Sequence, residues 1–481
     1  MSSARRVFAG YAAGVLLCLG LAAATGHWWV AALPALPALV WPLLTDVRWY
    51  FWLLLIMIPL GVEVSLPGGV GTDLPTEPIA VALTGVLLLH AARHWRAYPA
   101  VDFAHPAALL LYVHLAWLFV TALASTIPLF SVKFFLSKLW YVGAFFVAPV
   151  LFLRSPRRVL TFTHCLFWPL LFVAVQTLIR HASFGFSFAD QYRTMAPFMR
   201  NHVNYAACLA VCAPWVVYLF WWRRRGRRAA GRGRDWLPWL VVPVWLAAVY
   251  FSYTRAAYVA LVLAAGAYFV VRWRLLRPAV VLALVAGLGA TVFLIRNDKY
   301  LDYAPNFDTT IAHKQFDDLI AATYQLEDVS TMERFHRWVA GGNMVPYRPW
   351  TGFGPGTFVE QYPAYTNNNF RTWVSANPER SGIHNYYLMT LVEQGYPGLV
   401  ILVLWLVVVL LYGERAYHRQ RDPAARNAIL AAVLSLIVID AFQIINDLLE
   451  TDKVGSLFFL NIAILIVMSN YRPPTNSTTS R

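Results

Sequence analysis

The sequence predicts an all-α, polytopic integral membrane protein. Of its 481 residues, 59% are hydrophobic and only 13% are charged, whereas about a quarter of the residues in a soluble domain are charged. Many apolar runs approach the length of about 20 residues that a helix needs to cross a bilayer. This composition excludes most soluble classes and intrinsic disorder. The four cysteines all fall within apolar runs, so we expect neither a disulfide framework nor a zinc site.

Fourteen apolar segments are candidates for the membrane helices. In chain order they cover 7–25, 27–44, 49–66, 78–92, 105–124, 132–153, 159–179, 203–222, 236–253, 255–272, 278–295, 386–412, 424–446 and 455–470. The segment 78–92 is short and three prolines weaken 27–44, so we expect about 12 to 14 transmembrane helices. Arg5 and Arg6 precede the first segment, but no small-residue cleavage site follows, so we do not expect a cleaved signal peptide.

Basic clusters predict the orientation of the bundle. Cytoplasmic loops carry an excess of Lys and Arg, and with fourteen spans every basic cluster falls on the side of both termini. These clusters lie near Arg5, Arg93, Arg154, Arg223–Arg234, Arg272, Arg415 and Arg472. The net charge of +15 therefore mainly reports topology. The arginine run after Trp222 is better explained as a juxtamembrane lipid anchor than as a nucleic-acid site.

The predicted domain order is a bundle, a large outer loop and a second group of membrane helices. We place an N-terminal transmembrane bundle at 1–295, a loop or cap at 296–385, C-terminal transmembrane helices at 386–472 and a disordered cytoplasmic tail at 473–481. The loop is far longer than an ordinary connection. Between Asn297 and Asn385 it holds seven Lys and Arg against ten Asp and Glu, a net charge of −3, and it is rich in Trp and Tyr. Such aromatic content argues against disorder, so we expect a mostly helical extracytoplasmic cap.

Four basic residues approach the same outer surface in this topology. Arg193 and Arg200 precede the span that begins near residue 203, Arg255 lies in a tight turn between two spans, and His384 ends the long loop. A charged group at this depth is costly unless it is paired, lines a wet cavity or snorkels. Arg255 could snorkel to lipid headgroups, or its planar five-donor guanidinium could clamp phosphate oxygens. Arg193 and Arg200 could add positive charge or be ordinary surface arginines.

His384 is the candidate for proton transfer. Imidazole titrates near neutral pH and can accept a proton from an attacking hydroxyl as a general base, although a lone loop histidine is more often structural or solvated. Asn385 could cap the helix that follows. Weaker competitors are His202, His313 and His336. Acidic groups near the outer end of the penultimate span, among them Asp440, Asp447 and Glu450, could orient His384 or hold an acceptor.

The run Gly352-Phe353-Gly354-Pro355-Gly356 superficially resembles a phosphate-binding loop. A nucleotide site would need a preceding strand, a following helix and a compartment that contains nucleotides. The run is instead extracytoplasmic and includes a proline. We therefore expect a tight turn that lets the backbone approach the bundle closely.

Several motifs, taken together, resemble the O-antigen ligase and polymerase superfamily. The stretch His384-Asn385-x-x-Leu388, with Glu393, Gly395 and Gly398 after it, resembles the end of that family's long loop. Three upstream features stand in the same order, namely Ser252-x-Thr254-Arg255-Ala256, Arg334 with Trp338, and Gly352-x-Gly354-x-Gly356-x-Phe358. The segment from Arg193 to Asn204-Tyr205-Ala206 is similar to a further motif. Its spacing leaves open whether Arg193 or Arg200 is the equivalent arginine. The resemblance covers roughly residues 190–412.

Resemblance to WaaL-type O-antigen ligases implies a GT-C-like glycosyltransferase of the Gram-negative inner membrane. Such an enzyme transfers O-antigen polysaccharide from undecaprenyl diphosphate to a sugar hydroxyl of lipid A–core oligosaccharide, at the periplasmic face. The implied reaction is inverting and needs neither metal nor nucleotide, and no nucleic acid partner is expected. His384 would be the base. Arg255, with Arg193 or Arg200, would clamp the diphosphate, and the possible supporting residues are Asn385, Arg334, Asp440 and Asp447.

Three other functions compete with O-antigen ligation. An O-antigen polymerase or a protein O-oligosaccharyltransferase would use a similar donor with another acceptor. A lipid or polysaccharide transporter is disfavoured, because the notable charges lie at the outer edge and the sequence shows no inverted repeat.

Overall fold

A computed structural model describes Cys18 and residues 46–66, 70–231, 235–304, 328–370, 375 and 380–473. The chain divides into two compact units, Met1–Leu54 and Leu55–Arg481. Apart from Cys18, the candidate spans 7–25 and 27–44 lie outside the described residues, as do residues 305–327 of the outer loop and all but the first residue of the tail 473–481. The arrangement below concerns the second unit.

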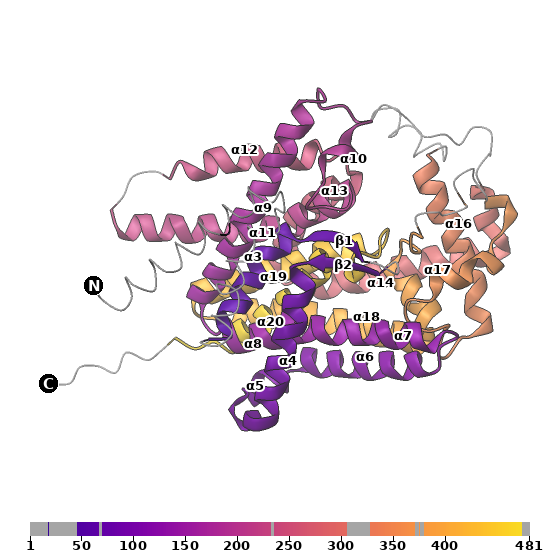
Figure 1. Ribbon diagram of the computed structural model, residues 1–481, viewed down its shortest axis with the longest axis horizontal. Coiled ribbons are helices and arrows are strands. Elements are labelled where there is room, and N and C mark those ends of the chain that lie inside the picture. Colours follow the sequence, from indigo (N-terminus) through magenta and orange to yellow (C-terminus); the bar gives the residue numbers. More distant parts are fainter. Residues whose placement is uncertain are drawn as a thin grey trace. The chain divides into compact units, whose positions relative to one another are not determined.

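The all-α membrane fold is confirmed. In the described part of the chain, nine helical segments are long and apolar enough to cross a bilayer. They are α6 (Pro106–Leu123), the continuous segment from α7 (Pro128–Val142) through η3 (Gly143–Val147) to α8 (Ala148–Phe152), α9 (Pro156–Ala182), α11 (His202–Ala229), α13 (Arg255–Arg272), α14 (Leu276–Ile295) with η4 (Arg296–Tyr303), α18 (Tyr386–Arg419), α19 (Pro423–Phe442) and α20 (Asp452–Asn470). Shorter or less apolar helices α3 (Arg48–Leu60), α4 (Thr76–His94) and α12 (Leu237–Tyr250) match the three remaining candidates (Figure 1).

Local capping explains where several of these helices begin. The side chains of Ser155, Asn201, Asn385 and Asp422 each accept a hydrogen bond from a backbone N–H in the first turn of α9, α11, α18 and α19. Such caps satisfy amide groups that have no partner within the helix. Proline at the first position of α9 and α19 fixes a helical φ where no N–H is needed.

A short hairpin replaces the end of one predicted span. The apolar segment 49–66 is helical only to Leu60, and β1 (Val62–Leu66) pairs antiparallel with β2 (Val70–Leu74), with Val62 opposite Leu74. The prediction of one continuous helix over 49–66 is therefore wrong at its C-terminal end. A Cβ at Gly61 would lie 2.9 Å from Thr76 Oγ1, so the chain turns at a residue without a side chain. The β-branched valines that follow favour extended structure.

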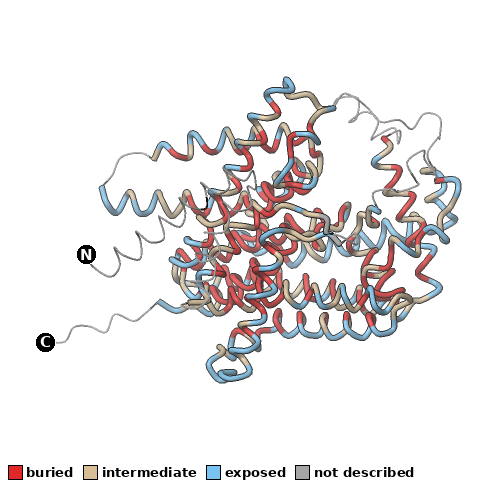
Figure 2. The backbone as a smooth tube through the Cα atoms, viewed as in Figure 1, coloured by how far each residue is buried: buried red, intermediate tan, exposed pale blue. Residues whose placement is uncertain are grey.

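The interior of the second unit is built around α11, α19 and α20. These three helices have the highest buried shares, 78%, 72% and 89% of their apolar windows, and α19 packs against both of the others (Figure 2). Ser435 Oγ donates to Val211 O at 2.7 Å, and Trp215 Nε1 donates to Asn461 Oδ1 at 3.0 Å. Interhelical hydrogen bonds of this kind are typical of membrane bundles. By contrast, the α14 window has a mean hydropathy of 2.4 and none of it is buried within the protein, as expected for a lipid-facing helix.

The described part of the outer loop is mostly helical, as predicted. It contains α16 (Val329–Met344) and a series of short helical turns, namely η5 (Val345–Tyr347), α17 (Phe358–Gln361), η6 (Tyr362–Tyr365) and η7 (Asn368–Phe370). Helix α16 contacts α18, so this part of the loop packs on the bundle (Figure 1).

The glycine run docks on a break in α18. Gly395 has φ of +70°, which interrupts the helix and leaves preceding carbonyl groups without helical partners. The carbonyls of Val392 and Glu393 accept hydrogen bonds from the backbone of Phe353 (3.0 Å) and Gly354 (2.9 Å). A Cβ at Gly352 would lie 2.3 Å from the carbonyl carbon of Glu393. The predicted close backbone approach is therefore confirmed.

The carboxylate of Glu393 completes this junction. It accepts hydrogen bonds from the backbone N–H of Gly356 at 2.9 Å and of Phe358 at 3.1 Å, the latter at the start of α17. Gln394 O accepts from Trp117 Nε1 of α6 at 3.0 Å. Hydrogen bonds to Glu393 and Gln394, next to the break at Gly395, thus join the loop and α6 to α18.

We predict that Gly352→Ala destabilises the protein by about 1–3 kcal/mol, because the new Cβ meets backbone atoms and φ is +66°. Gly342→Ala is the matched control, since it lies within α16 with no atom within 4 Å of the added Cβ. The melting midpoint of each detergent-purified variant is measured by heating samples and monitoring the folded fraction by size-exclusion chromatography. Equal midpoints for the two variants would show that the close approach is unimportant.

Candidate functional site

Charged side chains from distant parts of the sequence meet where α16 covers the outer end of the bundle. We define the outer cluster as Arg255, Asp328, Arg334, Arg337, His384 and Asp447. It joins the start of α13, the N-terminal part of α16, the segment before α18 and the connector between α19 and α20. Three predicted site residues, Arg255, Arg334 and His384, therefore lie together, with predicted Asp447 beside them.

Arg255 is the first residue of α13 and makes an ion pair with the cap. Its Nη2 lies 3.0 Å from Oδ2 of Asp328, whose side chain is only 3% exposed. Asp328 is also the N-cap of α16, where it accepts from the backbone N–H of Thr331 (3.1 Å) and from Thr331 Oγ1 (2.6 Å). The guanidinium of Arg255 is therefore paired with a carboxylate instead of extending to the lipid headgroups.

Two arginines of α16 point toward the segments that hold His384. Arg334 Nε donates to Ile445 O at 3.2 Å, and Arg337 Nη1 donates to Gly382 O at 3.3 Å. Burial lowers the pKa of Arg334 to about 10, so it remains protonated at neutral pH. Arg337 was not predicted, although its i,i+3 spacing from Arg334 places both on one helix face and could have revealed it.

Backbone contacts fix the position of His384. Trp338 Nε1 donates to Ile383 O at 3.0 Å, and the N–H of Tyr386 donates to Gln443 O at 2.9 Å. His384 itself has φ of +56°, an uncommon conformation for a residue with a side chain. Asn385 acts as the predicted cap by accepting from Leu388 N at 2.9 Å.

Asp447 is the acidic partner of His384. The Nδ1 of His384 lies 3.8 Å from Asp447 Oδ1, and the backbone N–H of His384 donates to the Asp447 carboxyl group. Gly382 allows this approach, because a Cβ there would lie 2.0 Å from Asp447 Oδ2. A carboxylate beside one ring nitrogen can orient the imidazole and leave the other nitrogen for chemistry.

The surroundings of His384 keep its ring neutral. Burial, followed by the positive charges of Arg334 and Arg337, lowers the pKa of His384 to about 3. Burial also raises the pKa of Asp447 above its ordinary value. An anion bound among the arginines would offset their charge and raise the pKa of the imidazole.

The remaining predicted residues have other partners, except that His202 adjoins Arg255, because Thr254 Oγ1 donates to the His202 carbonyl at 3.3 Å. Arg193 is 57% exposed and pairs with Asp190 at 3.2 Å. Arg200 is 62% exposed and lies 3.8 Å from Glu63. Asp440 is on α19, where its backbone carbonyl accepts from Tyr387 OH at 3.2 Å and its Oδ1 has no hydrogen-bond partner in the described ranges.

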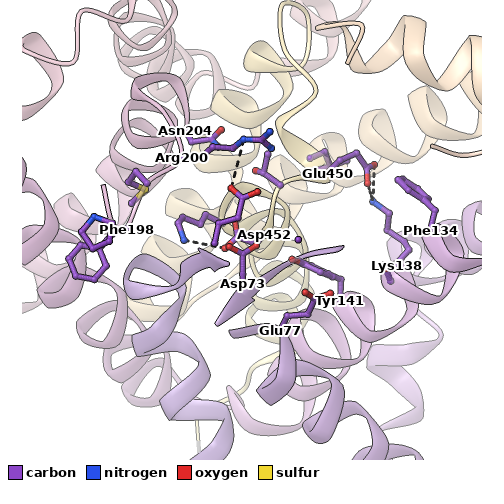
Figure 3. A pocket seen from close by; sticks show the side chains of 18 of the residues that line it. Asp73, Glu77, Phe134, Lys138, Tyr141, Phe198, Arg200, Asn204, Glu450 and Asp452 are labelled. Carbon is purple, nitrogen blue, oxygen red and sulfur yellow. Dashed lines mark hydrogen bonds and ion pairs between the residues drawn. The ribbon is translucent and has the colours of Figure 1, made fainter. Parts of the chain in front are cut away.

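A cavity of about 560 Å³ adjoins the outer cluster. We call it the hairpin cavity, because β1, β2 and α4 form one wall, and residues from α7, the 196–204 segment and the 449–453 segment form the others (Figure 3). The connector that carries Asp447 continues directly into its wall, where Glu450 pairs with Lys138 at 2.7 Å.

Within the described residues, no group of three or more His, Cys, Asp or Glu could hold a metal ion. Metal-independent chemistry remains a prediction.

Part of the chain matches a known protein family. Residues 239–403 match a family model described as O-antigen ligase. The matched part is about a third of the chain and runs from α12 into α18, so it includes Arg255, Arg334, Arg337 and His384 but not Arg193, Arg200 or Asp447. No curated protein matches the chain. The match supports the predicted resemblance to the O-antigen ligase and polymerase superfamily.

We predict a graded loss of stability at Asp328. Asp328→Asn keeps a cap acceptor and loses the ion pair with Arg255, whereas Asp328→Ala loses both, and a cap alone contributes about 1 kcal/mol. Melting midpoints should therefore fall in the order wild type, Asn, Ala, with Asp302→Asn, an exposed carboxylate in η4, unchanged. Identical midpoints for the two Asp328 variants would contradict the cap. A wild-type midpoint for Asp328→Asn would contradict the ion pair.

Proposed function

We propose that this protein is an O-antigen ligase that transfers a glycan from undecaprenyl diphosphate to a sugar hydroxyl of lipid A–core oligosaccharide. The O-antigen ligase match supports the broader O-antigen ligase or polymerase function, and the apolar helices support a membrane-embedded protein. The observation that carries the proposal is the outer cluster. It sets a neutral histidine with a neighbouring carboxylate beside Arg334 and Arg337, and Arg255 lies next to Arg334, within or next to the matched segment.

The arginines suit a diphosphate. Guanidinium groups donate in a planar fork that matches phosphate oxygens, and three of them converge here. Arg334 and Arg337 are better placed to assist Arg255 than the exposed Arg193 and Arg200, because Arg334 lies beside both Arg255 and Arg337; Arg337 also pairs with Glu333 at 3.4 Å. The donor diphosphate would share Arg255 with Asp328, so binding of the donor would be coupled to the position of α16.

His384 would act as the general base. It takes the proton of the acceptor hydroxyl while that oxygen forms a bond to the anomeric carbon, and the bond from this carbon to the diphosphate oxygen breaks. The lipid diphosphate leaves with its growing charge stabilised by the arginines. Attack opposite the leaving group inverts the anomeric centre. Asp447 orients the ring and stabilises the imidazolium that forms.

Donor binding would also tune this base. An imidazole with a pKa of about 3 is a weak base, and catalysis is most efficient when the pKa lies near the operating pH. The negative diphosphate offsets Arg334 and Arg337, which raises the pKa of His384 only once a donor is present.

The proposed reaction also has a sidedness. The active site would lie on the periplasmic face of the inner membrane, and both termini would lie on its cytoplasmic face.

Reconstitution tests the proposal directly. Purified protein is incubated with undecaprenyl diphosphate-linked glycan and lipid A–core, without nucleotide, and the products are separated by gel. Glycan on the core supports ligation. Longer lipid-linked chains would instead indicate an O-antigen polymerase. Glycan on an added protein acceptor would indicate a protein O-oligosaccharyltransferase.

We predict that His384→Ala lowers the transfer rate by about 10²–10⁴-fold, the usual effect of removing a general base. Membrane insertion and the melting midpoint should change little by comparison. The matched control is His94→Ala, an exposed histidine at the end of α4. Wild-type rates in the His384 variant would remove it from the mechanism.

We predict an unusually low acid limit for kcat/KM, which reports groups of the free enzyme. The pKa of His384 is depressed below the 6.5 of free imidazole, so the ring stays neutral as the pH falls and is protonated only near pH 3. The loss of activity attributable to His384 should therefore begin well below pH 6.5. In Arg337→Gln this limit should move upward, because a neighbouring positive charge is removed. An acid limit near pH 6.5 in the wild type would contradict this environment.

A further inference from the structure

The hairpin cavity is separate from the outer cluster but shares a structural segment with it. None of Arg255, Arg334 or His384 lines the cavity, yet the connector after α19 contacts His384 through Asp447 and enters the cavity wall two residues later at Leu449. A group bound in the cavity is therefore beside the residues proposed to perform transfer. Its volume of about 560 Å³ lies within the range of small-molecule sites.

The cations of the cavity are neutralised by carboxylates. Lys138 pairs with Glu450 at 2.7 Å, Lys453 with Asp452 at 3.2 Å, and Arg200 lies 3.8 Å from Glu63 (Figure 3). Each of the three basic residues of the lining thus has an acidic partner.

Two carboxylates of the lining remain without an ion pair in the described part of the chain. Glu77 accepts a hydrogen bond from Thr72 Oγ1 at 2.7 Å, and Asp73 lies beside Asp452 and Lys453. The lining therefore has five acidic and three basic residues, a formal charge of −2. Burial and the charge of Asp452 raise the pKa of Asp73 to about 6, so it is still mostly ionised at pH 7.5. An anionic ligand would meet net repulsion here.

A buried amide in the wall lacks a partner. Asn204 of α11 is 8% exposed, lines the cavity, and its Oδ1 has no hydrogen-bond partner among the described residues. A buried acceptor without a partner costs about 1–3 kcal/mol, and because this oxygen is fully enclosed, a ligand recovers that cost only when the Asn204 amide turns toward the cavity. Carboxylates and an amide oxygen together call for a ligand rich in donors.

Aromatic rings supply the apolar part of the lining. Phe134 and Tyr141 come from α7, and Phe198, at the edge of the cavity, comes from the segment before α11 and packs against Phe172 (Figure 3). Apolar and aromatic surface with a few placed polar groups is the usual make-up of a ligand site. Saccharides combine many hydroxyl donors with C–H faces that pack on aromatic rings, so they match both parts of this lining.

We propose that the hairpin cavity is a saccharide subsite, which takes an uncharged or amine-bearing sugar of one substrate and rejects sugars that carry phosphate or carboxylate. The proposal rests on the glycan transfer proposed above. The sugar belongs either to the lipid-linked donor or to the acceptor, because both present hydroxyl-rich residues near His384.

Direct binding tests the subsite without requiring transfer. Full-length protein in detergent at pH 7.5 is mixed with lactose, glucosamine, glucuronic acid or glucose 6-phosphate, and saturation-transfer NMR measures binding. Lactose and glucosamine should bind, and the two anionic sugars should not. Asn204→Leu should weaken lactose binding about tenfold. The double variant Asp73→Asn/Glu77→Gln should admit glucuronic acid, because it removes both carboxylates that have no ion pair, whereas the control Asp302→Asn should not.

Three results would overturn the subsite. They are wild-type binding of the anionic sugars as tight as that of lactose, no binding of any sugar, or Asn204 and Asp73/Glu77 variants that behave like the Asp302 control. Melting midpoints of all variants are measured in parallel, and Asn204→Ser replaces any Leu variant that does not fold.

Transfer kinetics then identify the source of the sugar. A raised KM for the lipid-linked donor alone in Asn204→Leu assigns the subsite to the donor, and a raised KM for lipid A–core alone assigns it to the acceptor. Unchanged values for both would overturn a role in substrate binding. Sugar binding with no transfer by the wild type would contradict the proposed function and leave the subsite intact, whereas transfer without sugar binding would do the reverse.

Discussion

The break of α18 at Gly395 is the constraint on which the outer end of the protein depends. Interrupting the helix leaves carbonyl groups that must find partners, and the glycine run supplies them through Phe353 and Gly354. Glu393 reinforces the junction by accepting from the amides that follow. Because the first part of α18 is held in this way, His384 lies just ahead of a fixed helical turn rather than on a free loop.

A second interaction holds the cap over the site. Asp328 begins α16 and neutralises Arg255, and α16 in turn directs Arg334 and Arg337 toward the segments around His384. The same carboxylate therefore contributes to helix start, charge balance and cap position. In the proposed reaction an incoming diphosphate would compete for Arg255, which would couple substrate binding to the cap.

The outer cluster and the hairpin cavity differ in electrostatic character. The cluster sets a neutral imidazole beside the guanidinium groups of Arg334 and Arg337, whereas the cavity pairs all its cations and retains carboxylates without an ion pair in the described part of the chain. Two adjoining sites of opposite preference suit a substrate that has an anionic carrier at one end and an uncharged glycan at the other. The connector from Asp447 to Glu450 belongs to both sites and fixes their separation.

The sequence by itself determined the all-α membrane fold, the spans from residue 105 onward, the helical cap and the candidacy of Arg255, Arg334, His384 and Asp447. These followed from apolar run length, basic clusters and motif order, which are local properties of the chain. Only the tertiary structure decided that Arg337 joins the cluster while Arg193 and Arg200 pair elsewhere, and that 62–74 forms a hairpin beside a cavity. The pair of Arg200 with Glu63 and the approach of Arg337 to the His384 segment join residues far apart in the chain, whereas Asp190 lies only three residues before Arg193. Local sequence patterns do not specify such long-range contacts, which is why the tertiary structure decides them.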